Sequence, residues 1–242
     1  MFGLKIDGAI ARLTLDRPQA RNAIPAAGWA ELAHRIGEAA GSDVRILVLS
    51  GEGGTFCAGA DLGDFAAMRD DEAAPTAFRR AMRTALDALR DLQVPTVAAI
   101  DGACFGAGVA LAMACDLRIA APDARFAITP AKIGLSYPQE DVHRLVALVG
   151  PGQAARLLFT AETIDAGEAN AIGLVERVAP PGGAEAIVAA ISANAKESLA
   201  ALKRGIRLAG EGRASDAEQD RRFDAIIASD ELARRLEALR RK

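Results

Sequence analysis

The chain has 242 residues, a length that suits one large α/β domain or one domain with a helical extension. Hydrophobic residues make up 51% of the chain and aromatic residues only 4%, a balance that favours closely packed helices over a β-sandwich. The net charge of −3 gives no general attraction to nucleic acid, and no stretch reaches the roughly 18 apolar residues that a membrane-spanning helix needs.

The first half of the sequence alternates between strand-like and helix-like patterns. Apolar runs predict strands over 9–15, 44–50 and 96–101, and apolar stripes at helical spacing predict helices over 24–40 and 78–92. After the third strand, a run of small residues predicts a helix that ends near Cys115.

The second half continues with short strands and then becomes helical. The patterns predict strands over 116–120, 125–128 and 173–178, and helices from 141, over 151–160, over 183–209 and over 215–242. This order predicts an α/β layered fold, with a core over residues 1–182 and a helical region over 183–242. Because a helical tail of this length cannot bury its apolar faces alone, we expect it to pack on the core or on a neighbouring subunit.

The three cysteines, Cys57, Cys104 and Cys115, fit neither a zinc-binding spacing nor a paired disulfide framework. With only two histidines, the chain is not expected to hold a metal ion. We therefore expect a reducing, cytoplasmic compartment. The N-terminal residues MFGLKIDGAI also lack the apolar segment of a secretory signal.

Two glycine-rich turns follow predicted buried strands and are the strongest candidates for chemistry. The first is FCAGADL at 56–62, and the second is Gly106-Ala107-Gly108 at the predicted start of a helix. Small residues let the main chain approach a ligand closely, and the first turn of a helix presents free N–H groups. Two converging N–H groups make an oxyanion hole, which lowers a barrier by roughly 3 kcal/mol per donor when charge develops on a carbonyl oxygen. Alternatively, both turns are only tight connections between a strand and a helix.

Further segments in colinear order, over about residues 5–180, share a pattern with the two turns. The segments are DRPQARNAI at 16–24, FCAGADL at 56–62, ACFGAGVALAMACDLRIA at 103–120, ARFAITPAKIGL at 124–135 and GPGQAARLLFTAETIDAGEANAIGLVERV at 150–178. Together they resemble the signature of the enoyl-CoA hydratase/isomerase (crotonase) superfamily. The resemblance implies a crotonase-type spiral of ββα turns, with a C-terminal helical region that builds a homotrimer or a hexamer.

The resemblance also implies an acyl-coenzyme A thioester as substrate, so that coenzyme A belongs to the substrate and no separate cofactor is needed. The implied oxyanion hole consists of the main-chain N–H groups of Ala60 and Ala107. Family members contact coenzyme A at positions that match Arg21, Ala58, Ala60, Asp61 and Leu62. Tyr137, the only tyrosine of the chain, is a candidate to hydrogen-bond a substrate group.

Two positions depart from the hydratases of the family. Their two catalytic glutamates match Ala110 and Pro130, neither of which can transfer a proton. Water addition needs a base to activate the water and an acid to protonate the α-carbon, so ordinary hydratase activity is not expected. Some isomerases of the family carry a single carboxylate on the following loop, and Glu140 is the candidate base there, with Asp141 and His143 as alternative proton carriers. Alternatively, Glu140 and Asp141 are only the acidic start of a helix.

The sequence thus favours an isomerase-like double-bond shift over hydration. In this hypothesis the N–H groups of Ala60 and Ala107 hold the thioester oxygen of an enolate, and Glu140 transfers the proton. The alternatives are an acyl-CoA-binding protein without catalysis, a decarboxylation, an atypical hydration or a thioester hydrolysis. A nucleophilic Ser136 beside His143 is disfavoured because no aspartate is placed to orient the histidine.

Overall fold

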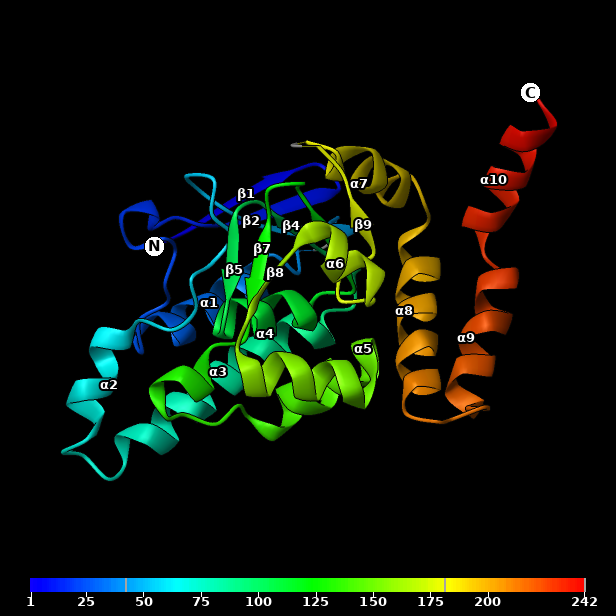
Figure 1. Ribbon diagram of the computed structural model, residues 1–242. Coiled ribbons are helices and arrows are strands. Elements are labelled where there is room, and N and C mark those ends of the chain that lie inside the picture. Colours follow the sequence, from blue (N-terminus) through cyan, green and yellow to red (C-terminus); the bar gives the residue numbers. More distant parts are fainter. Residues whose placement is uncertain (42, 181, 242) are drawn as a thin grey trace.

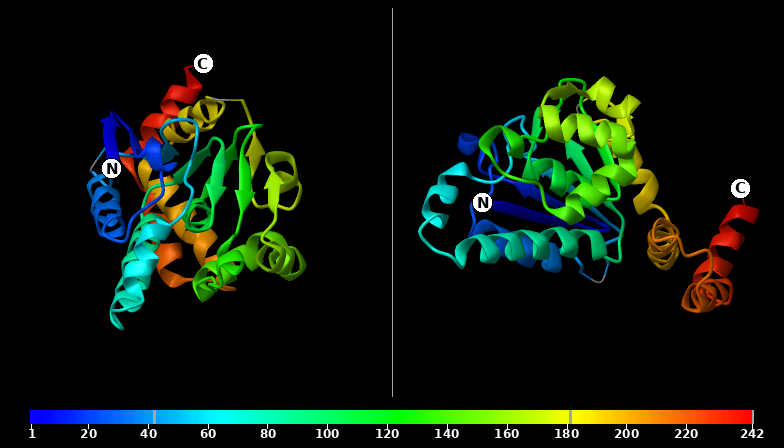
Figure 2. Two further views of the ribbon diagram at one scale, coloured as in Figure 1. Left: turned by 60° about the vertical axis from the view of Figure 1, so that its left-hand side comes forward. Right: turned by 60° about the horizontal axis from the view of Figure 1, so that its bottom comes forward.

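The computed structural model describes residues 1–41, 43–180 and 182–241. They form two β-sheets surrounded by helices (Figure 1), which confirms the mixed α/β class. Helices α8, α9 and α10 stand to one side of the sheets, and α2 lies at the opposite side (Figures 1 and 2). Within the described ranges, no helix combines the length and apolarity needed to cross a membrane.

The larger sheet has six strands in the order β1-β2-β3-β4-β6-β9. The strands are β1 Phe2–Asp7, β2 Ile10–Leu15, β3 Ile46–Gly51, β4 Thr96–Ile100, β6 Leu117–Ala120 and β9 Arg177–Val178. Strands β1 and β2 are antiparallel, and all later pairs are parallel. Because β3 and β4 are parallel neighbours, the chain leaves both strands at the same edge of the sheet, toward the first glycine-rich turn after β3 and toward β5 and the second turn after β4.

The smaller sheet has three strands in the order β5-β7-β8, and its strand β5 leads directly into the second turn. Its strands are β5 Ala103–Phe105, β7 Arg125–Ala127 and β8 Thr163–Asp165. An isolated bridge pairs Cys57 with Cys104, in which Cys57 N–H donates to Ala103 O at 2.9 Å and Phe105 N–H donates to Cys57 O at 2.9 Å. These bonds attach the first turn directly to the second.

Helices cover both sheets. They are α1 Gly28–Glu38, α2 Leu62–Met68, α3 Ala74–Asp91, α4 Ala107–Ala114, α5 Gln139–Thr160, α6 Ala166–Ala171, α7 Ala184–Ser192, α8 Lys196–Gly210, α9 Ala217–Ile227 and α10 Asp230–Arg240, with 3₁₀ turns η1 Pro18–Ala20 and η2 Pro130–Ile133. Helix α4 lies at the centre, and every residue from Gly108 to Ala114 is buried. Its small side chains allow the neighbouring elements to approach the helix closely on all sides.

The sequence of strand β3 is apolar because both faces of this strand are buried. Leu47 and Leu49 belong to the main core, whereas Ile46 and Val48 belong to a second cluster with Val188 of α7. Because successive residues of a strand point to opposite faces, both faces of the sheet are covered. Each such aliphatic side chain contributes about 1.5–3 kcal/mol of burial free energy.

Several elements differ from those predicted. The two helices predicted from 141 and over 151–160 join in α5, which is kinked at Gly150 (φ 75°, ψ 163°) before Pro151. The strand predicted over 173–178 contains only Arg177 and Val178 in β9. The sequence patterns predict neither strands β1, β5 and β8 nor helices α2 and α6.

The end of the chain is helical, in four helices where the patterns predicted two. The linker 193–195 separates α7 from α8, and α9 ends before residue 228. Helices α9 and α10 bury none of their residues within the part of the chain that the structure describes. Phe223 is 64% exposed and Leu239 is 68% exposed, so this region presents apolar side chains to its surroundings.

Candidate active site

The first glycine-rich turn connects β3 to α2 and is held in place by the preceding segment. Ile24 N–H donates to Gly59 O at 2.8 Å, and Asp61 N–H donates to Ile24 O at 2.9 Å. Asp61 caps α2 by accepting from Gly63 N–H at 3.1 Å, and its other oxygen accepts from Arg17 Nη1 at 2.6 Å. The hydrogen bond from Arg17 lowers the pKa of Asp61, so this residue is an ionised support of the turn.

The second turn opens helix α4. Gly106 has φ 51° and ψ −116°, a conformation that favours glycine, and its N–H donates to Ala127 O at 2.8 Å. The two turns meet at Gly59, where an added Cβ would lie 2.9 Å from Phe105 O and 3.3 Å from Ala107 N. Gly59 therefore brings the main chain beside Ala60 close to the start of α4.

Two main-chain N–H groups at this meeting point have no partner. Within the described residues, neither Ala60 N–H nor Ala107 N–H donates a hydrogen bond, although their neighbours Ala58, Gly59 and Asp61 all do. Ala60 and Ala107 both line one cavity. Two free donors on a shared wall have the arrangement that an oxyanion hole requires.

The cavity has a volume of about 550 Å³ and lies between the two turns, α2, α3 and the segment 129–141. Its lining residues are Ala58, Gly59, Ala60, Leu62, Phe65, Met68, Arg69, Pro75, Phe78, Arg79, Met82, Gly106, Ala107, Ala110, Thr129, Pro130, Ile133, Leu135, Ser136, Tyr137, Pro138 and Asp141. The wall is mainly apolar. The rings of Phe65 and Phe78 pack edge to face, with their centroids 5.5 Å apart. An apolar wall with a few convergent polar groups suits an acyl chain attached to a polar head.

The structure brings some of the predicted site residues together and separates others. Besides Ala60 and Ala107, the residues Ala58, Leu62 and Tyr137 line the cavity, but Arg21 and Asp61 do not. Glu140, the predicted base, is exposed in the first turn of α5 and is not on the wall. Its position matches the alternative interpretation of an acidic helix start.

Asp141 is the only acid on the cavity wall among the described residues. Its side chain is 0% exposed, and Oδ1 accepts from Arg83 Nη1 at 3.0 Å. Oδ2 has no hydrogen-bond partner within the described chain. Burial raises the pKa of Asp141, and the charge and hydrogen bond of Arg83 oppose that rise.

The positions that match the hydratase glutamates also lie on the wall. Ala110 is buried in α4, and Pro130 begins η2. Neither side chain can accept or donate a proton there. The hydroxyl of Tyr137 lies at the same end of α4 and donates to Gly106 O at 3.0 Å. Burial raises the pKa of Tyr137 well above its usual value, so the phenol stays protonated.

Cys57 lies within the first turn and is not a nucleophile. Its side chain is buried, and burial raises the pKa of the thiol to about 12. The thiolate is the reactive form of cysteine, and almost none is present at neutral pH.

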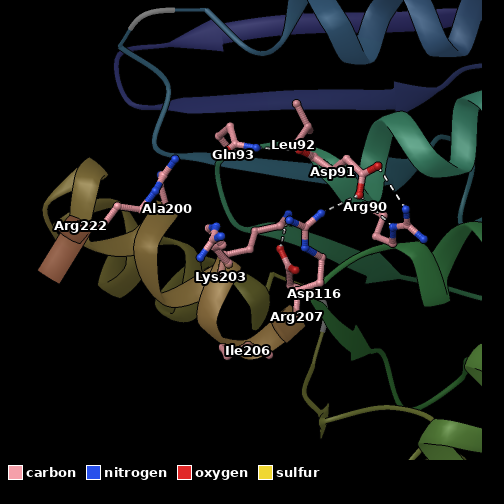
Figure 3. A pocket seen from close by; sticks show the side chains of 11 residues that line it. Arg90, Asp91, Leu92, Gln93, Asp116, Ala200, Lys203, Ile206, Arg207 and Arg222 are labelled. Atoms are coloured by element: carbon pink, nitrogen blue, oxygen red, sulfur yellow. Dashed lines mark hydrogen bonds and ion pairs between the residues drawn. The ribbon is translucent and has the colours of Figure 1, made fainter. Parts of the chain in front are cut away.

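A second cavity, of about 350 Å³, lies where α3 and the start of β6 meet α8 and α9 (Figure 3). Its lining has five basic side chains and two acidic ones, and two of the basic side chains, Arg204 and Arg222, pair with Asp216 and Glu218 outside the lining. Asp91 pairs with Arg90 at 2.9 Å and with Arg207 at 3.6 Å, and Asp116 pairs with Lys203 at 2.8 Å. Neither glycine-rich turn reaches this cavity, so it is not a candidate for thioester chemistry.

Comparison with known proteins identifies the family. A model of the family described as "Enoyl-CoA hydratase/isomerase" matches residues 5–228. The chain belongs to this family. The protein named "Probable enoyl-CoA hydratase echA6" of Mycobacterium tuberculosis is 38% identical over 206 residues, which cover 84% of this chain and 81% of that protein. The "Short-chain-enoyl-CoA hydratase" of Clostridium acetobutylicum is 37% identical over 186 residues, which cover 74% and 68% of the two chains.

A solved structure agrees with this assignment. The crystal structure of an enoyl-CoA hydratase/isomerase family protein from Hyphomonas neptunium superimposes with a TM-score of 0.93 and 36% identity, over 98% of this chain and 94% of that one. The crotonase-type fold expected from the resemblance is thereby confirmed.

The packing of the two family signature turns leads to a prediction on stability. A Cβ added at Gly108 would lie 2.4 Å from Cys57 O, inside van der Waals contact with main chain that cannot move freely. Gly108→Ala should lower the free energy of unfolding by about 3 kcal/mol, because overpacking of a rigid core is destabilising. Gly152→Ala is the matched control, since no atom lies within 4 Å of its added Cβ. Urea unfolding of both variants tests this, and equal stability would contradict it.

Proposed function

We propose that this member of the enoyl-CoA hydratase/isomerase family shifts a double bond of an acyl-CoA thioester through an enolate. One observation carries the proposal. Two unpaired N–H groups, those of Ala60 and Ala107, share a cavity with one buried carboxylate, Asp141, whereas Ala110 and Pro130 provide no acid. A double-bond shift needs one proton carrier, but hydration needs an acid and a base.

In the proposed mechanism, the thioester oxygen accepts hydrogen bonds from both N–H groups. Removal of a proton from C2 of a 3-enoyl-CoA places negative charge on that oxygen, and the two donors stabilise it. The same carrier returns the proton to C4 and yields the 2-enoyl-CoA. No water is added, so substrate and product have the same mass.

Asp141 replaces Glu140 as the proposed proton carrier. Glu140 is exposed and outside the cavity wall, whereas Asp141 is buried on the wall with Oδ2 unpaired. Arg83 holds Oδ1, whereas Oδ2 is buried without a hydrogen-bond partner, so a proton on Oδ2 would break no existing hydrogen bond. The raised pKa of Asp141 makes it a stronger base than an exposed aspartate.

A second candidate function is acyl-CoA binding without turnover. The ion pair of Asp141 with Arg83 favours it, because a structural ion pair also explains a buried aspartate. Hydration is a third candidate, since relatives of this chain carry names of hydratases.

The experiment that separates these functions uses two substrates on purified protein. Crotonyl-CoA and 3-hexenoyl-CoA are incubated separately, and the products are resolved by chromatography and mass. Conversion of 3-hexenoyl-CoA to 2-hexenoyl-CoA without a gain in mass supports the proposal. Hydration of crotonyl-CoA contradicts it. Binding of both thioesters without any product identifies a binding protein, and release of free coenzyme A identifies a hydrolase.

We also propose that the chain assembles as a homotrimer or hexamer. Helices α9 and α10 bury none of their described residues, and Phe223 and Ile227 of α9 are 64% and 56% exposed. Apolar side chains at this density are typical of a surface that a partner covers. Light scattering coupled to size-exclusion chromatography should give a mass of three or six chains, and the mass of one chain would contradict the proposal.

The cytoplasmic location of the protein also stays a prediction.

A further inference from the structure

The hydroxyl of Tyr137 contacts the carbonyl side of a peptide group in the proposed oxyanion hole. It donates to Gly106 O at 3.0 Å. Gly106 O and Ala107 N–H are the two ends of a single planar peptide group. The phenol therefore acts on the peptide group that carries the unpaired N–H of Ala107, a residue of the cavity wall.

The two oxyanion donors are supported differently. The carbonyl of the Gly59–Ala60 peptide accepts from Ile24 N–H at 2.8 Å and from the buried thiol of Cys57 at 3.8 Å. The carbonyl of the Gly106–Ala107 peptide accepts from Val109 N–H at 3.0 Å, from Ala110 N–H at 3.3 Å and from the hydroxyl of Tyr137 at 3.0 Å. The Tyr137 hydroxyl is the side-chain donor to the peptide that carries Ala107 N–H, and its bond to Gly106 O is shorter than that of the thiol to Gly59 O, so its removal tests the support of this donor.

The direction of the hydrogen bond follows from the chemistry of its partners. A carbonyl oxygen only accepts, so the phenol must donate its proton. Burial raises the pKa of Tyr137 well above its usual value, which keeps this proton in place at neutral pH. Because the proton is engaged by Gly106 O, the hydroxyl faces a substrate only as an acceptor.

We propose that Tyr137 is a positioning residue that orients and polarises the Gly106–Ala107 peptide, so that Ala107 N–H becomes a stronger oxyanion donor. Hydrogen bonds in a chain strengthen one another by about 10–30% per bond in a site of low dielectric constant. The bond also restrains rotation of a peptide that follows Gly106, a residue with a positive φ of 51°. This inference rests on the proposed oxyanion hole, but it does not need the double-bond shift to occur.

The test measures polarisation of a bound carbonyl without any turnover. Butanoyl-CoA carrying ¹³C at its thioester carbonyl is bound to the protein, and isotope-edited infrared spectroscopy records the carbonyl stretch. We expect the wild-type protein to lower this frequency relative to free ligand. Tyr137→Phe keeps the ring but removes the hydroxyl, and it should lose a clear part of the shift while the Kd changes less than about threefold. Ser192→Ala, which removes a hydroxyl bonded to Ala189 O far from the cavity, is the control.

The single tyrosine of the chain permits a second variant. Growth on 3-fluorotyrosine labels position 137 alone and makes the phenol a more acidic, stronger donor. A larger infrared shift than in the wild type would follow from polarisation and not from packing. If turnover of a 3-enoyl-CoA is present, Tyr137→Phe should lower kcat by about tenfold with little change in KM, because one oxyanion donor is weakened but not removed.

The outcomes separate the inference from the proposed function. A full carbonyl shift in Tyr137→Phe, or no shift in the wild type, overturns the inference. A parallel loss of affinity and of thermal stability, with the shift per bound ligand unchanged, also overturns it. A wild-type shift that Tyr137→Phe reduces supports the inference even if no enoyl-CoA is isomerised, and in that case only the proposed double-bond shift fails.

Discussion

Replacing Ala107 with proline should lower turnover of a 3-enoyl-CoA by about 100- to 1,000-fold, because proline has no N–H to donate to the oxyanion. Ala107 is the first residue of α4, where the fixed φ of proline is compatible with the helix. The substitution therefore removes the donor with little change in the fold. Steady-state kinetics and calorimetric titration with butanoyl-CoA check the loss of turnover and the retention of binding.

The matched control for this variant is Ala217→Pro. Ala217 is the first residue of α9, so it receives the same substitution at the same helix position outside the cavity wall. It should keep the activity and thermal stability of the wild type. A folded Ala107→Pro protein with full turnover would show that Ala107 N–H does not hold the thioester oxygen.

Asp141→Asn should abolish the double-bond shift, with a fall of at least about 100-fold, because an amide cannot accept the proton that a carboxylate accepts. Glu140→Gln is the neighbouring control and should leave turnover unchanged, since Glu140 is exposed and outside the wall. Each variant is assayed with the same 3-enoyl-CoA, and its binding of butanoyl-CoA is measured separately. The reverse result, with Glu140→Gln inactive and Asp141→Asn active, would restore Glu140 as the base.

The pH dependence of turnover follows from the raised pKa of Asp141. A base works in its ionised form, so turnover should rise with pH through this raised pKa and then level off. Because the folded-state pKa exceeds the unfolded one, this group stabilises the fold at low pH. That contribution is lost as pH rises from the ordinary aspartate value through the folded-state pKa. If turnover of Asp141→Asn still fell at low pH in the same way as turnover of the wild type, the titration would belong to another group.

The elements that frame the site could be predicted from the sequence because their patterns are strong. The apolar runs of β3 and β4 are buried on both faces, and the turns after them contain the small residues that close contact requires. Short elements could not be predicted in this way. Helix α2 has seven residues and buries none of them, and β8 has three residues, so neither shows a period.

The position of the proposed base, Asp141, could be predicted only in part from the helical pattern of the sequence. Asp141, Leu145 and Val149 are buried at spacings of four residues, so they share one face of α5. Counting back from Leu145 indicates Asp141 and not Glu140 as the inward acid. The pairing of Asp141 with Arg83 on α3, far along the chain, leaves no local signal and required the structure.

The oxyanion donors proposed for this protein belong to the main chain, and this separates two kinds of change during divergence. Substitution of wall residues such as Ala110, Pro130 or Asp141 alters which protons can move. The same substitutions leave both N–H groups in place, because two parallel strands and their cross-bridge set the positions of those groups. If these two N–H groups bind the thioester carbonyl as proposed, a lineage built on this scaffold can exchange its acid–base chemistry one residue at a time and still bind that carbonyl.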